Sequence, residues 1–239
     1  MIKKFLKDII FKIEDIQNEE KNLVRFFLKI PRHADMRILE VGCGYGRNIK
    51  LLGEHGYNVL GVEVNEAIVK SNNESNIKCL TVEEFDKTSE LYDVILMSHV
   101  IEHIYPDELL KFMEHYLARL KPGGFLIIVT PLNSPYFYDD FDHVKPYSPV
   151  GIDMVFGDKN AQVKYYGKNK IELVDIWFRR SPFKIVNFKG RFLGGQYHIQ
   201  MFNIICGILF RITFHIVGRC DGWMGLYKKS LDNNTGVFN

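Results

Sequence analysis

The chain has 239 residues, of which 46% are hydrophobic and 25% charged, and this length fits one α/β domain with additions better than two full domains. A net charge of +2 without any lysine- and arginine-rich block gives no argument for nucleic acid binding. Four scattered cysteines predict a reduced, cytoplasmic environment, and Lys7, Asp8 and Lys12 interrupt any signal-peptide core.

Apolar residues recur at helical spacing through residues 2–30, and Pro31 ends this pattern before a strand. Two amphipathic helices are therefore expected. Their predicted role is to cover an edge of the sheet or to close over a cofactor. Packing against the core is favoured over an arm that binds a partner.

A glycine-rich loop follows the first predicted strand, which includes Ile38, Leu39 and Val41. Glycines occupy positions 42, 44 and 46, and a helix begins near Asn48. Glycine allows the backbone to turn tightly and to approach a ligand where a Cβ would collide. A dinucleotide site would need a small residue where Arg47 stands, and Glu40 would repel a pyrophosphate but accept hydrogen bonds from an ammonium group.

The second predicted strand, residues 58–63, ends in Glu63, which lies 17 residues beyond Gly46. Folds of this kind place a ribose-binding carboxylate at about this offset, and its two oxygens can accept from both ribose hydroxyls. A helix is expected from Glu66. A third strand is expected at residues 77–82, and Glu83 after it is either a ligand contact or a solvated acid.

Further alternation of strands and helices follows. Residues 92–97 predict a strand, the apolar stripe from Leu109 to Leu120 predicts a helix, and the Lys121–Gly124 turn leads into a strand at 125–130. Such alternation predicts a parallel sheet with helices on both faces.

This series resembles the motifs of the class I S-adenosylmethionine (SAM) dependent methyltransferases. The resemblance rests on the Glu-x-Gly-x-Gly-x-Gly loop, on Tyr92–Ile95 followed by His99–His103, and on Leu120–Gly124 before an apolar strand. It is closest to the branch with ubiquinone-biosynthesis O-methyltransferases and small-molecule and glycan methyltransferases. It implies a Rossmann-like, mostly parallel seven-stranded sheet with an N-terminal helical extension and C-terminal additions. The cofactor candidates are Glu40, Gly42, Cys43, Gly44, Tyr45, Gly46, Glu63, Val64, Glu83, Ser98 and His99.

Catalytic candidates lie beyond the fifth strand, where open α/β sheets bind their ligands. A hydroxyl acceptor needs a base, and His143 is the first candidate because an unperturbed imidazole titrates near neutral pH. Asp142 is expected to orient it, and His103 completes the catalytic set. The alternative is that His143 is a loop histidine with structural hydrogen bonds only.

A divalent metal is the second option at this site. If helical, His99, Glu102 and His103 lie on one face. Related small-RNA and quinone methyltransferases hold a metal with Glu-x-x-Glu-His and a later histidine, and here His99 replaces the first glutamate. His143 would supply the later histidine. No metal is expected, because His-x-x-Glu-His also occurs in metal-free members.

The chain after residue 150 departs from the compact family pattern. Ser148 and Pro149 predict a helix start, residues 171–178 fit either a helix or a strand, and residues 183–188 predict a strand. Polar residues interrupt the apolar run 199–217, so a buried or membrane-surface helix is favoured over a transmembrane span, with Arg211 as a candidate phosphate contact. Residues 223–228 fit a last, antiparallel strand, and the tail from Leu231 is expected to be disordered.

The sequence thus predicts a single domain over 1–239, divided into helices 1–35, a cofactor-binding core 36–150, acceptor-side additions and last strands 151–230, and a tail 231–239. We expect SAM-dependent O-methylation of a small molecule or a glycan, with a lipid-linked glycan included, and no nucleic acid partner. The expected location is cytoplasmic, with peripheral membrane contact as an option. The alternatives are a non-catalytic SAM-binding subunit and, disfavoured, an NAD-type dehydrogenase. The identity of the acceptor and the oligomeric state are not predicted.

Overall fold

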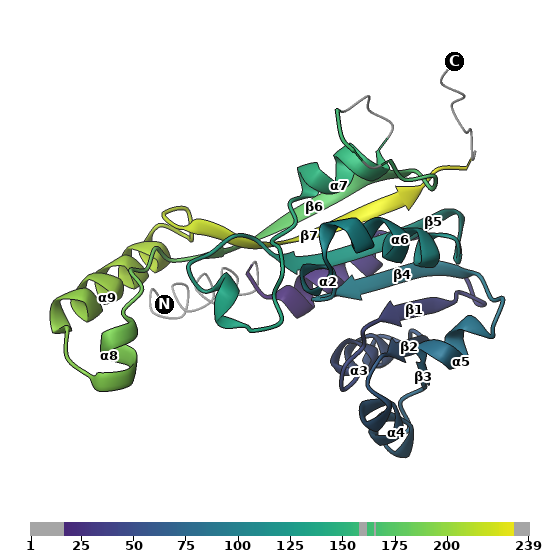
Figure 1. The fold of residues 1–239 in the computed structure, drawn as a ribbon, viewed down its shortest axis with the longest axis horizontal. Helices are drawn as coiled ribbons and strands as arrows, with labels where there is room; N and C mark the ends of the chain where they lie inside the picture. Colours follow the sequence, from purple (N-terminus) through teal and green to yellow (C-terminus); the bar gives the residue numbers. More distant parts are fainter. Residues whose placement is uncertain (1–16, 158–161, 165, 232–239) are drawn as a thin grey trace, which may run out of the picture.

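The computed structural model describes residues 17–157, 162–164 and 166–231. One seven-stranded sheet runs through it, in the order β3-β2-β1-β4-β5-β7-β6 (Figure 1). Strands β1 to β5 pair in parallel, whereas β7 is antiparallel to both of its neighbours. The strands are β1 (Ile38–Val41), β2 (Val59–Glu63), β3 (Cys79–Thr81), β4 (Tyr92–Ser98), β5 (Leu120–Pro131), β6 (Ile171–Ser181) and β7 (Arg219–Lys229). The mostly parallel seven-stranded sheet predicted from the sequence is confirmed.

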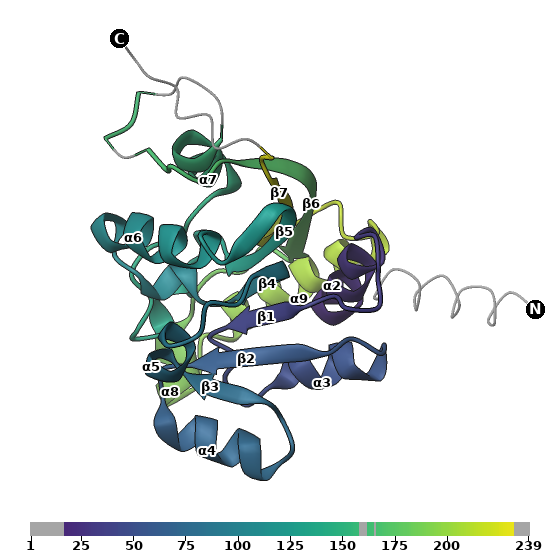
Figure 2. The same cartoon turned by 90° about the vertical axis from the view of Figure 1, so that its right-hand side faces the viewer.

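Helices cover both faces of this sheet, as Figure 2 shows. On one face, α5 (Val82–Asp86), α6 (Pro106–Leu117) and α7 (Pro149–Phe156) pack on a core that includes Leu39 and Val41. On the other, α2 (Glu19–Phe27), α3 (Arg47–Glu54) and α4 (Glu66–Glu74) pack on a second core with Ile38 and Val94. Burial on both faces explains why β1 is apolar without alternation, apart from Glu40.

Side-chain caps fix where several helices begin. Asn65 accepts hydrogen bonds from two backbone amides at the start of α4, and Ser148 accepts from Gly151 N at the start of α7, as its sequence predicts. Thr81 and Glu84 form a reciprocal capping box at α5. Because of that box the third strand ends at Thr81, and the chain enters a helix at Val82 instead of continuing the strand.

The C-terminal elements test three predictions. Residues 171–181 form strand β6, which removes the helix alternative, and β7 confirms the last antiparallel strand. The strand predicted at 183–188 is wrong. Its backbone pairs with a side chain instead of a neighbouring strand: Ile185 N donates to Asn203 Oδ1 at 2.8 Å, and Asn203 Nδ2 donates to Ile185 O at 3.0 Å.

Residues 182–218 form a helical arm that contains α8 (Phe188–Leu193) and α9 (Tyr197–Ile212). Figure 1 shows α8 and α9 at one end of the molecule, beyond the ends of β6 and β7. Only Phe210 is buried within α9, and no residue is buried within α8. Of the two alternatives expected for this apolar run, a buried or a membrane-surface helix, the buried helix is therefore wrong. No described helix is long and apolar enough to cross a membrane.

Two predictions fall on parts of the chain outside the described residues. These are the first of the two N-terminal helices, which would occupy part of residues 1–16, and the tail 231–239, of which only Leu231 is described. The second N-terminal helix is confirmed as α2, which Asn18 caps and which buries Leu23, Phe26 and Phe27.

Candidate active site

The glycine loop joins β1 to α3 through three left-handed residues, with φ of 66° at Gly42, 50° at Gly44 and 71° at Gly46. A Cβ on Gly42 would lie 2.7 Å from Val100 Cγ2, so the loop also packs closely against the segment after β4. A Cβ on Gly44 would meet no atom within 4 Å. Gly44 therefore leaves open space over the loop, as expected for a backbone that a ligand approaches.

Glu40 is buried beneath this loop. Asn48 Nδ2 donates to its Oε1 at 2.7 Å, but its Oε2 has no hydrogen-bond partner among the described residues. Burial raises the pKa of Glu40 to about 7, although the Asn48 hydrogen bond acts in the opposite direction. A buried carboxylate with one unpaired oxygen fits a cationic ligand group, because an ammonium would supply the missing hydrogen bond.

Glu63 stands at the end of β2, directly beside the loop. Its Oε2 accepts from Gly44 N at 3.0 Å, and its Oε1 accepts from Asn65 N at 3.1 Å. The carboxylate is thus held in place by two backbone amides before any ligand contact. Such support orients both oxygens for a pair of hydroxyl donors.

The remaining cofactor candidates divide by position. Cys43 turns into the protein, with its sulfur 3.4 Å from Cys79 Sγ, so its backbone alone faces the loop surface. Tyr45 and Val64 are exposed beside the loop. Glu83 is exposed on α5, and Ser98 is the last residue of β4.

His99 follows β4 in a left-handed conformation, with φ of 57°. Its Nδ1 lies 3.2 Å from Glu102 Oε1, and its Nε2 lies 3.1 Å from Glu19 Oε1. Burial opposes the charged imidazole, but the hydrogen bonds and charges of Glu102 and Glu19 outweigh it and raise the pKa of His99 to about 9. His99 is therefore an imidazolium between two carboxylates.

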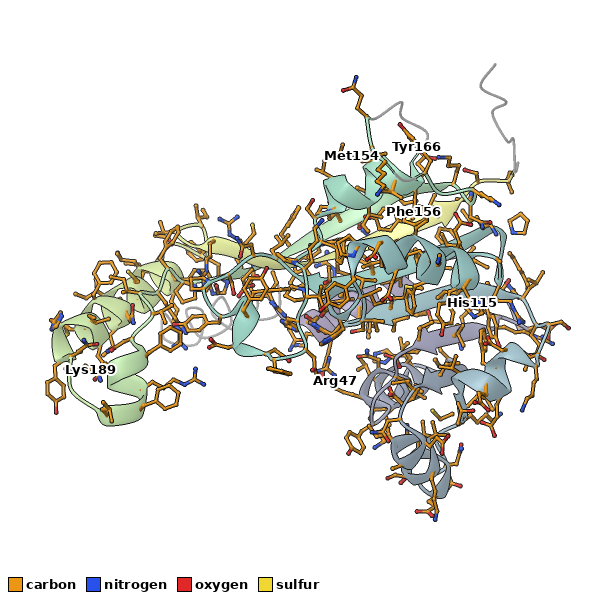
Figure 3. The ribbon with its side chains drawn as sticks, viewed as in Figure 1. Arg47, His115, Met154, Phe156, Tyr166 and Lys189 are labelled. Atoms are coloured by element: carbon orange, nitrogen blue, oxygen red, sulfur yellow. The ribbon has the colours of Figure 1, made fainter. Side chains whose placement is uncertain are left out.

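Glu19 extends this network to other elements. Its Oε2 accepts from Arg179 on β6 at 3.0 Å, and Arg47 on α3 lies 3.5 Å from its Oε1. Arg47 is labelled in Figure 3, close to where α2 and α3 meet. Glu19 and Arg179 were not predicted as site residues, because an acid in a first helical turn and an arginine in a strand carry no motif.

His143 occupies the loop beyond β5, between a short 3₁₀ helix (Phe137–Asp139) and α7. Its Nδ1 lies 2.7 Å from Phe137 O, so in the neutral ring Nδ1 donates and Nε2 is left with a lone pair. The expected orienting residue, Asp142, is exposed, and within the described residues its carboxylate forms no hydrogen bond or ion pair with His143. The carbonyl of Phe137 orients the imidazole instead. The nearest acid is Asp140, whose Oδ2 lies 3.7 Å from His143 Nε2.

The metal option is reduced to three of its four residues. The 3₁₀ helix Ile101–His103 separates the side chains that an α-helix would have aligned, so His99 faces Glu19 while His103 faces Asp142 O at 3.2 Å. Ligand atoms of Glu102, His103 and His143 lie within 4.8 Å of one another. Glu102, however, is fully buried, and its oxygens already pair with His99 and with Thr130 Oγ1 at 2.9 Å.

A family profile described as a methyltransferase domain matches residues 13–188. The chain belongs to the class I SAM-dependent methyltransferases. SAM is the cofactor of this family, and the unpaired Glu40 oxygen together with the open space over Gly44 fits its amino acid end. For a methyltransferase of this family, Glu63 stays the predicted contact of the ribose, and the loop backbone the predicted contact of the methionine part.

Curated relatives align over part of their length. The ubiquinone biosynthesis O-methyltransferase of Bradyrhizobium diazoefficiens is 31% identical over 103 residues, which are 40% of this chain and 40% of that protein. The enzyme of the same name from Rickettsia bellii is 33% identical over 114 residues, 43% and 46% of the two chains. The chain thus matches less than half the length of these relatives.

Solved structures extend the similarity over most of the chain. A SAM-dependent methyltransferase from Archaeoglobus fulgidus gives a TM-score of 0.57 at 22% identity and covers 87% of this chain and 92% of its own. The N-methyltransferase NodS from Bradyrhizobium japonicum WM9 gives 0.52 at 14% identity, covering 89% and 94%. At such identities these similarities show the fold alone, and the fold carries more than one kind of acceptor.

Proposed function

We propose that the protein transfers the methyl group of SAM to a hydroxyl oxygen of a small molecule, with His143 as the base. The observation that carries this proposal is the position of His143. It lines a cavity of about 270 Å³ beyond β5, and its Nδ1 is engaged by Phe137 O while Nε2 is available to accept a proton. Relatives that are named O-methyltransferases support an oxygen acceptor.

The residues divide the work between binding and proton transfer. Bound SAM supplies an activated methyl group, so the protein has to position the acceptor and exclude water. Glu40 and the glycine loop hold the amino acid end, and Glu63 holds the ribose. His143 Nε2 removes the acceptor's hydroxyl proton. His103, whose ring centroid lies 4.9 Å from that of His143, passes the proton to solvent.

Three other accounts have less support from the same geometry. A dehydrogenase would place a pyrophosphate next to the buried Glu40 and would lack a small residue at Arg47. A metal-assisted methyltransferase would draw on Glu102, His103 and His143, yet the pairing of Glu102 with His99 and Thr130 competes with a metal. A non-catalytic SAM-binding subunit would need neither His143 nor the cavity beside it.

The helical arm supports a further part of the proposal, namely peripheral contact with a membrane. Its apolar side chains are largely exposed, including Phe192 at 76% and Ile212 at 64%. Residues 182–218 contain four lysines and arginines (Lys184, Lys189, Arg191 and Arg211) and no aspartate or glutamate. An apolar helix with only positive charges fits an anionic bilayer surface. A lipid-linked acceptor, such as a glycan, would be reached from that surface.

Calorimetry with SAM and with NAD distinguishes a methyltransferase from a dehydrogenase. We expect SAM to bind and NAD to give no heat of binding. Conversion of SAM to S-adenosylhomocysteine (SAH), measured with a panel of phenols, catechols and sugars, then tests catalysis. Binding of NAD instead of SAM would refute the assignment, and SAM binding without any transfer across the panel would favour the non-catalytic subunit.

A further inference from the structure

The cavity beside His143 lies where three strands reach the same edge of the sheet. Pro131 at the end of β5, Ser181 at the end of β6 and Arg219 at the start of β7 all line it, together with Lys184 from the coil that precedes α8. Ser181 and Arg219 are register partners across β6 and β7. The cavity therefore combines the proposed base with groups from the C-terminal strands.

One cation of this cavity is already neutralised. Arg179 donates to Glu19 Oε2 through NH1 at 3.0 Å and to Asp221 Oδ1 through Nε at 3.0 Å. Its remaining nitrogen lies 3.4 Å from Asp221 O. Arg179 thus has a structural role, because the carboxylates of Glu19 and Asp221 already balance its charge.

The other two cations have no such partners. Neither Arg219 nor Lys184 forms an ion pair with any residue in the described part of the chain. Arg219 Nε and Ser181 Oγ are both buried without a hydrogen-bond partner there. Unpaired buried donors are costly, and a guanidinium beside a hydroxyl is suited to an oxyanion. Arg211, the phosphate contact expected from the sequence, is exposed on α9 and is not among the residues that line this cavity.

Neighbouring acids do not cancel this charge. Asp139 pairs with Arg191 at 3.2 Å, and Asp140 is next to His143, with its Oδ2 3.7 Å from Nε2. Asp221, the one acid that lines the cavity, is engaged by Arg179. Arg219 and Lys184 therefore remain as surplus positive charge.

We propose that the methyl acceptor is an anion, which carries a carboxylate or a phosphate group bound by Arg219, Ser181 and Lys184 while its hydroxyl faces His143. This inference rests on the proposed function for the role of His143, but the anion site itself does not depend on methyl transfer. It assigns specificity to residues that carry no family motif. Acceptors without the charged group would leave Arg219 unpaired and would bind more weakly.

Binding of small anions to the SAH-loaded protein tests the inference. Phenyl phosphate, benzoate and the neutral benzyl alcohol are titrated by calorimetry at one fixed ionic strength. We expect at least one anion to bind about tenfold more tightly than benzyl alcohol, and the better anion identifies the class of acceptor. Arg219→Gln should lose about tenfold of that affinity, and Arg219→Lys should keep most of it, because a charged hydrogen bond contributes roughly that factor.

Matched variants distinguish the site from general positive charge. Lys184→Gln should weaken the anion about threefold, whereas Lys189→Gln should not change it, because Lys189 lies out on α8 (Figure 3). Equal binding of benzoate, phenyl phosphate and benzyl alcohol, or an Arg219→Gln protein that is folded and binds the anions as before, would overturn the inference. SAH affinity is measured in the same samples. Loss of SAH binding would count against the methyltransferase proposal, whereas anion binding tests the anion site separately.

Discussion

Glu19 Oε1 lies 3.1 Å from His99 Nε2, which joins the first turn of α2 to the segment directly after β4. The contact spans 80 residues of sequence. Glu102 pairs with the opposite side of the same ring, and Arg179 pairs with the other oxygen of Glu19. The N-terminal helix, the end of β4 and β6 are thus held together by charge beside the cofactor loop.

This network predicts a pH dependence of stability. The pKa of His99 is raised from 6.5 to about 9, so its contribution is complete below pH 6.5 and is lost as the pH rises through 9. Glu19 has a lowered pKa despite its burial, because His99, Arg179 and Arg47 favour its charged form, so its contribution is lost only in acid. We expect the free energy of unfolding to fall by about 1–2 kcal/mol between pH 6.5 and 9.5, after allowing for solvent screening of the His99 side chain.

Urea unfolding across this pH range measures the effect. A Glu19→Gln variant removes one of the two carboxylates that contact His99. It should therefore reduce the loss of unfolding free energy between pH 6.5 and 9.5. His33→Asn serves as the matched control, because His33 is half exposed and pairs with Asp93 away from the loop. A Glu19→Gln protein with the same alkaline loss as the parent would contradict this account of His99.

A second prediction concerns the proton on Glu40. Burial raises the pKa of Glu40 to about 7, so a fraction of the protein carries a neutral Glu40 at neutral pH. The ammonium of SAM favours the carboxylate and should lower that pKa. Binding at pH 7 is therefore expected to release a fraction of a proton. Calorimetry in buffers of different ionisation enthalpy measures this release, which should be absent in Glu40→Gln. Buffer-independent binding heats in the parent protein would be evidence against the assignment.

Glu63 supports both the loop and the ligand. Glu63→Ala should weaken SAM binding by about 1.5–3 kcal/mol, the range for hydrogen bonds to a charged group. Because Glu63 also accepts from Gly44 N and Asn65 N, part of the loss will come from the loop. Glu63→Gln keeps one acceptor oxygen and should lose less. Unchanged affinity in the folded Ala variant would remove Glu63 from the ribose site.

The sequence was informative where backbone geometry and burial leave a pattern. Three alternating glycines and the apolar strand before them predicted the loop, and Ser148 with Pro149 predicted the start of α7. The order of apolar strands and helices predicted the sheet because each pairing follows from local periodicity and handed connections. These features depend on short segments of the chain, so they can be predicted from the local sequence.

Long-range side-chain pairs left no such pattern. Glu19 contacts His99 and Arg179 only after the sheet has formed. The sequence predicts Asp142 and not Phe137 O as the partner of His143, because every residue has a backbone carbonyl and the sequence does not show which one is used. The predicted burial of α9 failed for a related reason. An all-round apolar helix fits a protein core as well as another apolar environment, and hydropathy does not distinguish them.

His143 is expected to determine turnover but not cofactor affinity. His143→Ala should reduce methyl transfer about 100-fold or more, because a general base contributes at least that factor, while SAM binding is unchanged. His198→Ala, on the helical arm, is the matched control. Near parental turnover at pH 7 in His143→Ala would exclude the base. Loss of activity with EDTA, restored by one divalent ion, would replace the base with a metal held by Glu102, His103 and His143.

The last prediction concerns the helical arm and membranes. If the arm lies on a bilayer, its exposed apolar side chains should carry the binding, so the changes must be made at exposed positions. Phe210 is unsuitable because it is buried and stacks on His215, with ring centroids 4.3 Å apart. We therefore choose Phe192→Ser with Ile208→Ser and Ile212→Ser, all in exposed residues.

Flotation with liposomes measures this binding. The parent protein should float with vesicles that contain phosphatidylserine, bind less to neutral vesicles, and lose binding as salt is raised, since the charges of residues 182–218 are all positive. The triple variant should remain in the dense fraction. Leu28→Ser, an exposed apolar residue on the body of the protein, should leave flotation unchanged. A parent protein that stays entirely with the dense fraction while eluting as a dimer would assign the arm to self-association, because a second arm can cover the same apolar surface.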